Sequence, residues 1–209
     1  MDSNFKSAEE RFEIIVDTLR NNNFTHHTTI ITGSNGSGKS VIRKSIRGKI
    51  EKEIGEEEVT RIGENHLIAS VSMERRTSND GIMNIFNSDT PWCPTSENTF
   101  HFIRGLLDNS TDHYIVIDEP EIGMSEEMQL LLCSYFNDKL AGLNSLGVLI
   151  ITHSRTIVKN ILHDQFINLD GMTEDQWVNR IPQVPTYTIE EFEEASHQLF
   201  LAIQKANKE

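Results

Sequence analysis

The chain has 209 residues, of which 37% are hydrophobic and 24% charged, a composition typical of a folded protein with one core. Its formal net charge of −13 disfavours non-specific binding to nucleic acid or anionic lipid. No basic segment followed by an apolar run opens the chain, and no long apolar stretch interrupts it. We therefore expect a single cytoplasmic domain over residues 1–209, with no membrane span and no disulfide or zinc scaffold.

The first part of the chain predicts a helix, a strand, a glycine-rich loop and a second helix. Residues 7–10 have the S-x-x-E form of a capping box, and apolar residues recur at helical spacing as far as Leu19. Residues 28–32 (TTIIT) are apolar and β-branched, which indicates a buried strand. From Lys39 to Gly55 we expect a helix with one face of isoleucines, namely Ile42, Ile46, Ile50 and Ile54.

The middle of the chain is less regular in its pattern. Residues 66–72 (HLIASVS) predict a second strand, and the polar residues that follow indicate an irregular segment. A helix is expected to begin at Thr95 and to carry the apolar residues Phe100, Ile103, Leu106 and Leu107. We expect residues 73–110 to form a reduced subdomain, partly irregular and partly helical.

The remainder of the chain alternates between strands and helices. Three short apolar runs predict buried strands at residues 114–117, 147–152 and 165–169. Residues 125–140 predict a helix that buries Met128, Leu131, Leu132, Tyr135, Phe136 and Leu140. Residues 172–209 are expected to form a C-terminal extension that ends in a helix over 189–205. This alternation predicts an α/β fold whose mainly parallel sheet is covered by helices on both faces.

The glycine-rich loop carries the strongest chemical motif. Residues 33–40 (GSNGSGKS) match G-x-x-x-x-G-K-[ST] between a predicted strand and a predicted helix, as a phosphate-binding loop requires. Glycines allow the backbone to turn its N–H groups inward, where the helix N-terminus also favours anions. Lys39 would reach the β- and γ-phosphates, and the Ser40 hydroxyl would bind Mg²⁺. The predicted nucleotide-binding residues are Gly33, Ser34, Asn35, Gly36, Ser37, Gly38, Lys39, Ser40 and Val41.

Two other predicted strands end in residues that suit the same chemistry. The strand over 114–117 is followed by Asp118, which would hold Mg²⁺ through water, and by Glu119, the natural base for an attacking water. His153 follows the strand over 147–152 and would sense the γ-phosphate as a hydrogen-bond donor. Without the glycine-rich loop, Asp118 and Glu119 could equally well belong to an ordinary strand end with solvated acids, and a lone histidine after a strand is more often structural.

Together these motifs resemble the ATP-binding-cassette ATPases. The phrase DEPEIGMS at 118–125 resembles their soluble branch, which includes RecF-like proteins, structural-maintenance-of-chromosomes proteins and the ATPase halves of overcoming-lysogenization-defect nucleases. The resemblance covers roughly residues 28–170 and implies a reduced, three-layer P-loop NTPase fold. It implies that residues 122–125 cross to a second subunit. It also implies catalytic or metal-binding roles for Lys39, Ser40, Asp118, Glu119 and His153.

The chain also departs from that family. Its glycine signature is missing, and the best counterpart is Ser96, which would serve a second subunit across a dimer interface. There Glu97 replaces the usual glycine, and a carboxylate facing a triphosphate would repel it. Glu74 is the nearest counterpart of the family's glutamine loop. Phe24 is the candidate for the aromatic ring that stacks on adenine, whereas Phe12 is expected in the helix core.

The leading function is a Mg²⁺-dependent ATPase in which ATP closes a homodimer or a complex with an effector protein, in a DNA-related or phage-defence process. An alternative is a nucleotide-gated regulatory subunit with little turnover of its own. A transporter nucleotide-binding subunit and a small-molecule phosphotransferase are the remaining alternatives. ATP and Mg²⁺ are the expected cofactors in the first case, and the net charge does not support DNA as a partner.

Two surfaces have both a functional and a structural interpretation. Residues 172–209, which include Trp177, are where a partner would dock, although a helix that simply closes the sheet is the favoured interpretation. The bases of the predicted helix over 39–55 are expected to form a solvated face rather than a DNA-binding one; they are Arg43, Lys44, Arg47 and Lys49.

Overall fold

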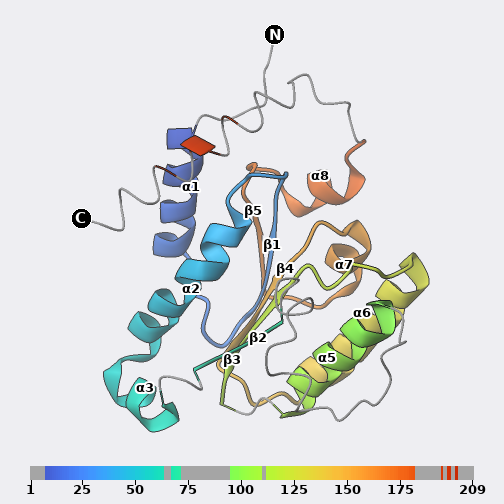
Figure 1. Cartoon of the computed structure of the whole chain (residues 1–209), viewed down its shortest axis with the longest axis horizontal. Helices are drawn as coiled ribbons and strands as arrows, with labels where there is room; N and C mark the ends of the chain where they lie inside the picture. The colour runs from blue at the N-terminus through green and yellow to red at the C-terminus, as the bar shows by residue number, and fades with distance from the viewer. Residues whose placement is uncertain are drawn as a thin grey trace.

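The computed structural model describes residues 8–63, 67–71, 95–109 and 112–181, and the single positions 194, 197, 198 and 201. Helices and strands alternate along it (Figure 1). The elements are α1 (Ala8–Asn21), β1 (Thr28–Thr32), α2 (Lys39–Ile54), α3 (Glu56–Ile62), β2 (Ile68–Val71), α5 (Thr95–Asn109), β3 (Tyr114–Asp118), α6 (Glu126–Leu140), β4 (Gly147–Ile151), α7 (Arg155–Asn160), β5 (Gln165–Asn168) and α8 (Glu174–Asn179).

The strands form one five-stranded sheet in the order β2-β3-β4-β1-β5, and every pairing is parallel. The predicted parallel sheet is therefore confirmed. Because parallel strands end at the same edge, the segments that follow β1, β3, β4 and β5 meet there. The register shows that these strand ends are neighbours, since Ile151 pairs with both Ile31 and Asp118, and Thr32 pairs with Asn168.

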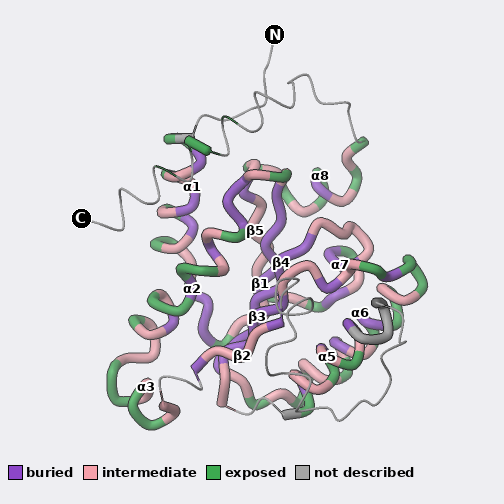
Figure 2. The backbone as a smooth tube through the Cα atoms, viewed as in Figure 1, coloured by how far each residue is buried: buried purple, intermediate pink, exposed green. Residues whose placement is uncertain are grey.

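Helices cover both faces of the sheet. Alternate side chains of each strand point to opposite faces, and each set joins its own buried cluster. Ile30, Ile117 and Ile150 pack with residues of α5, α6, α7 and α8, whereas Ile31 and Val116 pack with residues of α1 and α2. Figure 1 shows the two groups of helices on opposite sides, and Figure 2 shows buried residues along the strands between them. The fold is a three-layer α/β arrangement.

Helix α2 forms where its isoleucines predicted it. Ile42, Ile46 and Ile50 are all at most 1% exposed, because residues four apart share the face that lies on the sheet. The helix ends at Gly55, whose φ of 82° suits glycine and whose N–H donates to the Glu51 carbonyl. Helix α3 then follows without having been predicted. It has no buried residue and begins with glutamates that favour a helix N-terminus.

Helix α6 departs from the prediction on one side. Ser125 caps it by accepting the Met128 N–H, and Leu132 and Phe136 are fully buried as expected. Leu131 was predicted to be buried, but 55% of it is exposed, and Cys133 is buried instead. The buried stripe runs through positions 132, 133 and 136, which leaves position 131 on the solvent side of the helix.

The C-terminal extension is partly described. Helix α8 was not predicted; Thr173 and Gln176 form a capping box at its start. Trp177 is 0% exposed and belongs to the core on the α6 side of the sheet, so this side chain is not a docking surface. The helix predicted over 189–205 lies outside the described residues apart from four helical positions. In the described part of the chain, no helix is long and apolar enough to cross a bilayer.

Candidate functional site

The structure brings the predicted residues together at the carboxyl edge of the sheet. The loop over 33–38 joins β1 to α2, Asp118 ends β3, and His153 lies just beyond β4. The His153 Nε2 and Glu119 Oε1 atoms are 3.5 Å apart. Asp118 and Glu119 both act electrostatically on the Lys39 ammonium. Residues from three separate strand ends therefore share one electrostatic environment.

Lys39 is folded back over the glycine-rich loop. Its side chain is buried, and Nζ donates hydrogen bonds to the Gly33 carbonyl at 3.0 Å and to the Ser34 carbonyl at 2.8 Å. Burial lowers the pKa of Lys39 to about 8, although nearby carboxylates, with Asp170 the strongest, act in the opposite direction. A buried ammonium held mainly by carbonyl oxygens provides a strong attraction for an incoming anion.

Helix α1 braces the same loop from outside. The Arg11 guanidinium donates to the Gly36 carbonyl at 2.7 Å, a contact that the sequence did not predict. Gly38 has a φ of 103°, and a Cβ atom there would lie 2.2 Å from Ile15 Cδ1. The positive φ therefore favours glycine at position 38, and a Cβ atom there would also displace the end of the Ile15 side chain.

The loop also contains a buried hydroxyl that suits a ligand. Ser37 is 4% exposed, and its Oγ atom has no hydrogen-bond partner within the described structure. Buried polar atoms are nearly always paired, so an orphaned hydroxyl within the glycine-rich loop is consistent with a phosphate-binding cradle. Asn35 and Ser40 are exposed, and Val41 is half-buried in the first turn of α2.

Asp170 closes the loop from the end of β5. Its Oδ2 atom accepts the Ser34 N–H at 2.6 Å, and its Oδ1 atom accepts the Ser34 hydroxyl at 2.9 Å. Asp170 was not predicted as a site residue, because a single acid after a predicted strand carries no distinctive pattern. Its carboxylate places negative charge beside a loop otherwise suited to anions.

Asp118 faces a base from α2. Its Oδ2 atom lies 3.4 Å from Arg43 Nε, and both side chains are only 16% exposed. The expectation that Arg43 belongs to a solvated face is therefore wrong. The register of the loop and sheet places the first turns of α2 against the end of β3, so Arg43 points inward.

The oxygen atoms available here fit Mg²⁺ in kind. Ser40 offers a hydroxyl and Asp118 a carboxylate, which are hard oxygen ligands. Among the described residues there is no group of three or more His, Cys, Asp or Glu side chains that could hold a metal by themselves. Mg²⁺ is commonly held by one or two protein oxygens together with phosphates and water, so the donor set suits a nucleotide-bound ion.

Glu119 occupies an unusual backbone conformation. Its φ is 51°, in the left-handed region, and its N–H donates to the Ile151 carbonyl at 2.8 Å. A non-glycine residue with this φ is uncommon and indicates a turn held by its surroundings. Burial lowers the pKa of His153, and the Lys39 charge acts in the same direction, whereas the Glu119 charge acts against it. The pair thus combines a carboxyl group with an imidazole whose protonated form is disfavoured by burial.

Other predicted residues lie outside this constellation. Phe24 is 0% exposed in the core between α2 and the sheet, so it is not available to stack on adenine. Phe12 packs against the same core, as predicted. Ser96 lies in the first turn of α5, but its side chain, like the whole of Glu74, is outside the described residues.

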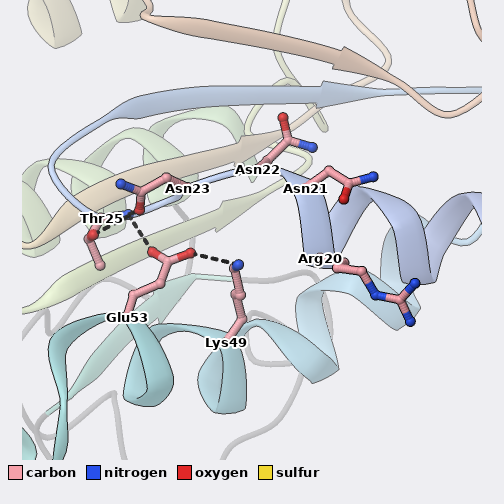
Figure 3. A pocket seen from close by; sticks show the side chains of 7 residues that line it. All are labelled: Arg20, Asn21, Asn22, Asn23, Thr25, Lys49 and Glu53. Atoms are coloured by element: carbon pink, nitrogen blue, oxygen red, sulfur yellow. Dashed lines mark hydrogen bonds and ion pairs between the residues drawn. The ribbon is translucent and has the colours of Figure 1, made fainter.

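One pocket lies away from this edge. It has a volume of about 310 Å³ and lies beside the segment that leads into β1 (Figure 3). There the Glu53 carboxylate accepts the backbone N–H groups of Phe24 and Thr25 and pairs with Lys49 at 3.1 Å. Since Glu53 is satisfied by the protein itself, its role here is to hold the turn before β1.

Comparison with protein-family models found no match, and comparison with curated protein sequences found no similar protein.

Proposed function

We propose that the chain is a small, Mg²⁺-dependent ATPase of the soluble ATP-binding-cassette type, with a reduced P-loop NTPase fold. The observation that carries this proposal is the buried Lys39 ammonium within the glycine-rich loop, at the sheet edge where Asp118, Glu119 and His153 also lie. Each of these residues is of the type that phosphoryl transfer to water requires, and together they come from the ends of three strands, β1, β3 and β4.

The residues would divide the chemistry as follows. The loop amides and the Lys39 ammonium bind the β- and γ-phosphates, with Nζ exchanging the Gly33 and Ser34 carbonyls for phosphate oxygens. Ser40 and Asp118 would hold Mg²⁺, which neutralises phosphate charge when bound. Glu119 orients a water molecule and accepts its proton, and His153 donates a hydrogen bond to the γ-phosphate.

ATP would act as a switch that closes a homodimer or a complex with an effector protein. The first turn of α5, with Ser96, would then face the nucleotide of the second subunit. A cytoplasmic location and a DNA-related or phage-defence role remain part of this proposal, and DNA is the partner that the charge of −13 supports least.

A nucleotide-gated regulatory subunit with little turnover is the second candidate. The proximity of Arg43 to Asp118 at 3.4 Å favours it, because a cation beside the carboxylate weakens that carboxylate as a magnesium ligand. Both candidates require ATP binding, and only the first requires sustained phosphate release.

The binding half of the proposal is tested with Lys39→Ala. We expect calorimetry to detect Mg·ATP binding to the wild-type protein and an affinity about 10- to 100-fold lower for the variant, because one charge-assisted bond to phosphate is lost. Lys44→Ala is the matched control, since Lys44 is exposed on the same helix. If no heat is detected when Mg·ATP is added to the wild-type protein, the proposal is contradicted. Sustained phosphate release by the wild-type protein would favour the ATPase over the regulatory subunit.

Asp170→Asn is expected to bind ATP about three- to tenfold more tightly, as removal of one nearby charge predicts. Asparagine keeps an acceptor for the Ser34 N–H but does not repel the triphosphate. Asp164→Asn is the control, because Asp164 precedes β5 and accepts the Thr28 N–H at 2.8 Å. Titration of each variant with ATP measures the effect. Weaker binding by Asp170→Asn would instead mean that its charge supports the loop.

A further inference from the structure

Glu121 lies in the turn between β3 and α6, two residues beyond Glu119, and no role for it follows from the sequence motifs. Both of its carboxylate oxygens are used. Oε2 accepts the Thr152 hydroxyl at 2.8 Å, and Oε1 accepts the backbone N–H of His153 at 2.7 Å. Thr152 is 0% exposed, so its hydroxyl is buried, and Glu121 is half-buried. One side chain thus joins the turn after β3 to the end of β4.

This clamp acts beside the Glu119 and His153 side chains. The Glu119 N–H donates to the Ile151 carbonyl at 2.8 Å. The turn after β3 and the end of β4 are therefore joined a second time, one residue before Thr152. The Thr152 hydroxyl in turn accepts the Ser154 N–H at 2.9 Å, and Ser154 caps α7. Glu121 therefore holds the His153 backbone directly through its N–H, and it holds the preceding residue through the Thr152 hydroxyl, which in turn binds Ser154.

A carboxylate is a costly group to place here. Burial raises the pKa of Glu121, while the His153 N–H and the Thr152 hydroxyl stabilise its charged form. Removing the carboxylate would leave the His153 N–H and the buried Thr152 hydroxyl without an acceptor. The backbone around His153 would then shift until these donors find other acceptors. A shift of the imidazole by about 1 Å is enough to impair positioning in a catalytic site.

We propose that Glu121 is a positioning residue of the site: by holding the His153 backbone, it keeps the imidazole beside Glu119, so that turnover depends on it and ATP affinity does not. This inference rests on the proposed function, because it assigns Glu121 to the same reaction. Glu121 itself is not assigned a contact with nucleotide or water.

The test compares Glu121→Ala with Glu121→Gln in the full chain. Alanine removes both acceptors, and we expect it to lower kcat about 10- to 100-fold while KM for ATP changes less than about threefold. Glutamine can accept the His153 N–H through Oε1 and donate to Thr152 Oγ1 through its amide. It should therefore retain at least about a third of the wild-type kcat.

Glu126→Ala is the matched control. Glu126 is exposed in the first turn of α6, and its Oε1 atom accepts the Thr156 hydroxyl at 3.3 Å. The Glu126→Ala variant loses the same kind of carboxylate from the same region, but the bonds to Thr152 and His153 stay intact. Its kcat should therefore equal that of the wild type. Should Glu121→Ala fail to fold, Thr152→Val removes one of the two bonds with little change in shape.

A second readout does not need turnover. The imidazole resonances of His153, assigned with a His153→Gln variant, should shift in Glu121→Ala and stay in place in Glu126→Ala. Unchanged kcat and unchanged resonances in Glu121→Ala would overturn the inference, as would an equal loss in the Glu126→Ala control. Absence of Mg·ATP binding by the wild-type protein would overturn the proposed function instead, so the two failures are distinguishable.

Discussion

Glutamine in place of Glu119 is expected to slow phosphate release by about 10²- to 10⁴-fold, the range that general-base catalysis supplies. The amide has nearly the shape of the carboxylate but cannot accept a proton from water. Because Glu119 is assigned to the attacking water rather than to the phosphates, ATP affinity should stay within a few-fold of the wild-type value. Single-turnover phosphate release and calorimetry measure the two quantities separately.

Glu174→Gln provides a matched control for this substitution. Glu174 Oε2 lies 3.3 Å from His163 Nε2, so the chain contains a second pair of a glutamate and a histidine that involves none of the predicted site residues. The same chemical change there should leave phosphate release unaltered. Wild-type release by Glu119→Gln would remove Glu119 from the role of base.

The stalled Glu119→Gln protein also tests the switch. With Mg·ATP bound and hydrolysis blocked, it should sediment as a dimer or retain an effector protein, whereas Lys39→Ala should do neither. A monomer that binds ATP without retaining a partner would exclude closure as the consequence of binding.

Alanine in place of Trp177 is expected to lower the free energy of unfolding by about 3–5 kcal/mol, as for other large-to-small changes of buried aromatic residues. Trp177 is 0% exposed and packs in the core that includes residues of α5, α6 and α7. Helix α8 has only six residues, too few to be stable by itself, so its position depends on this side chain. The Arg180 guanidinium also lies 3.5 Å from the centre of the Trp177 ring.

The change in the free energy of unfolding is measured by urea unfolding, from the midpoint and the slope of the transition. Trp177→Phe should recover much of the lost stability because it refills part of the cavity. Leu131→Ala removes an apolar side chain that is 55% exposed, and it should change stability by no more than about 0.5 kcal/mol. A Trp177→Ala protein as stable as the wild type would contradict the assignment of this side chain to the core.

Long and strongly patterned elements were predictable from the sequence. Strand β1 has the predicted bounds of Thr28–Thr32, and α2 begins and ends where its isoleucine face and Gly55 indicate. Helices α3, α7 and α8 were missed. They have seven, six and six residues, which is too short for a periodic apolar face to be visible, and α7 and α8 begin at the side-chain caps Ser154 and Thr173.

The sequence by itself determined the α/β class, the glycine-rich loop, and the polar residues that end neighbouring strands, because runs, periods and loop motifs are properties of adjacent residues. Only the tertiary structure decided what surrounds them. Asp170 reaches Ser34, 136 positions away, because β5 pairs with β1, and Glu121 meets Thr152 because β3 pairs with β4. Such contacts depend on strand order and register, which bring distant single residues together without leaving a local pattern.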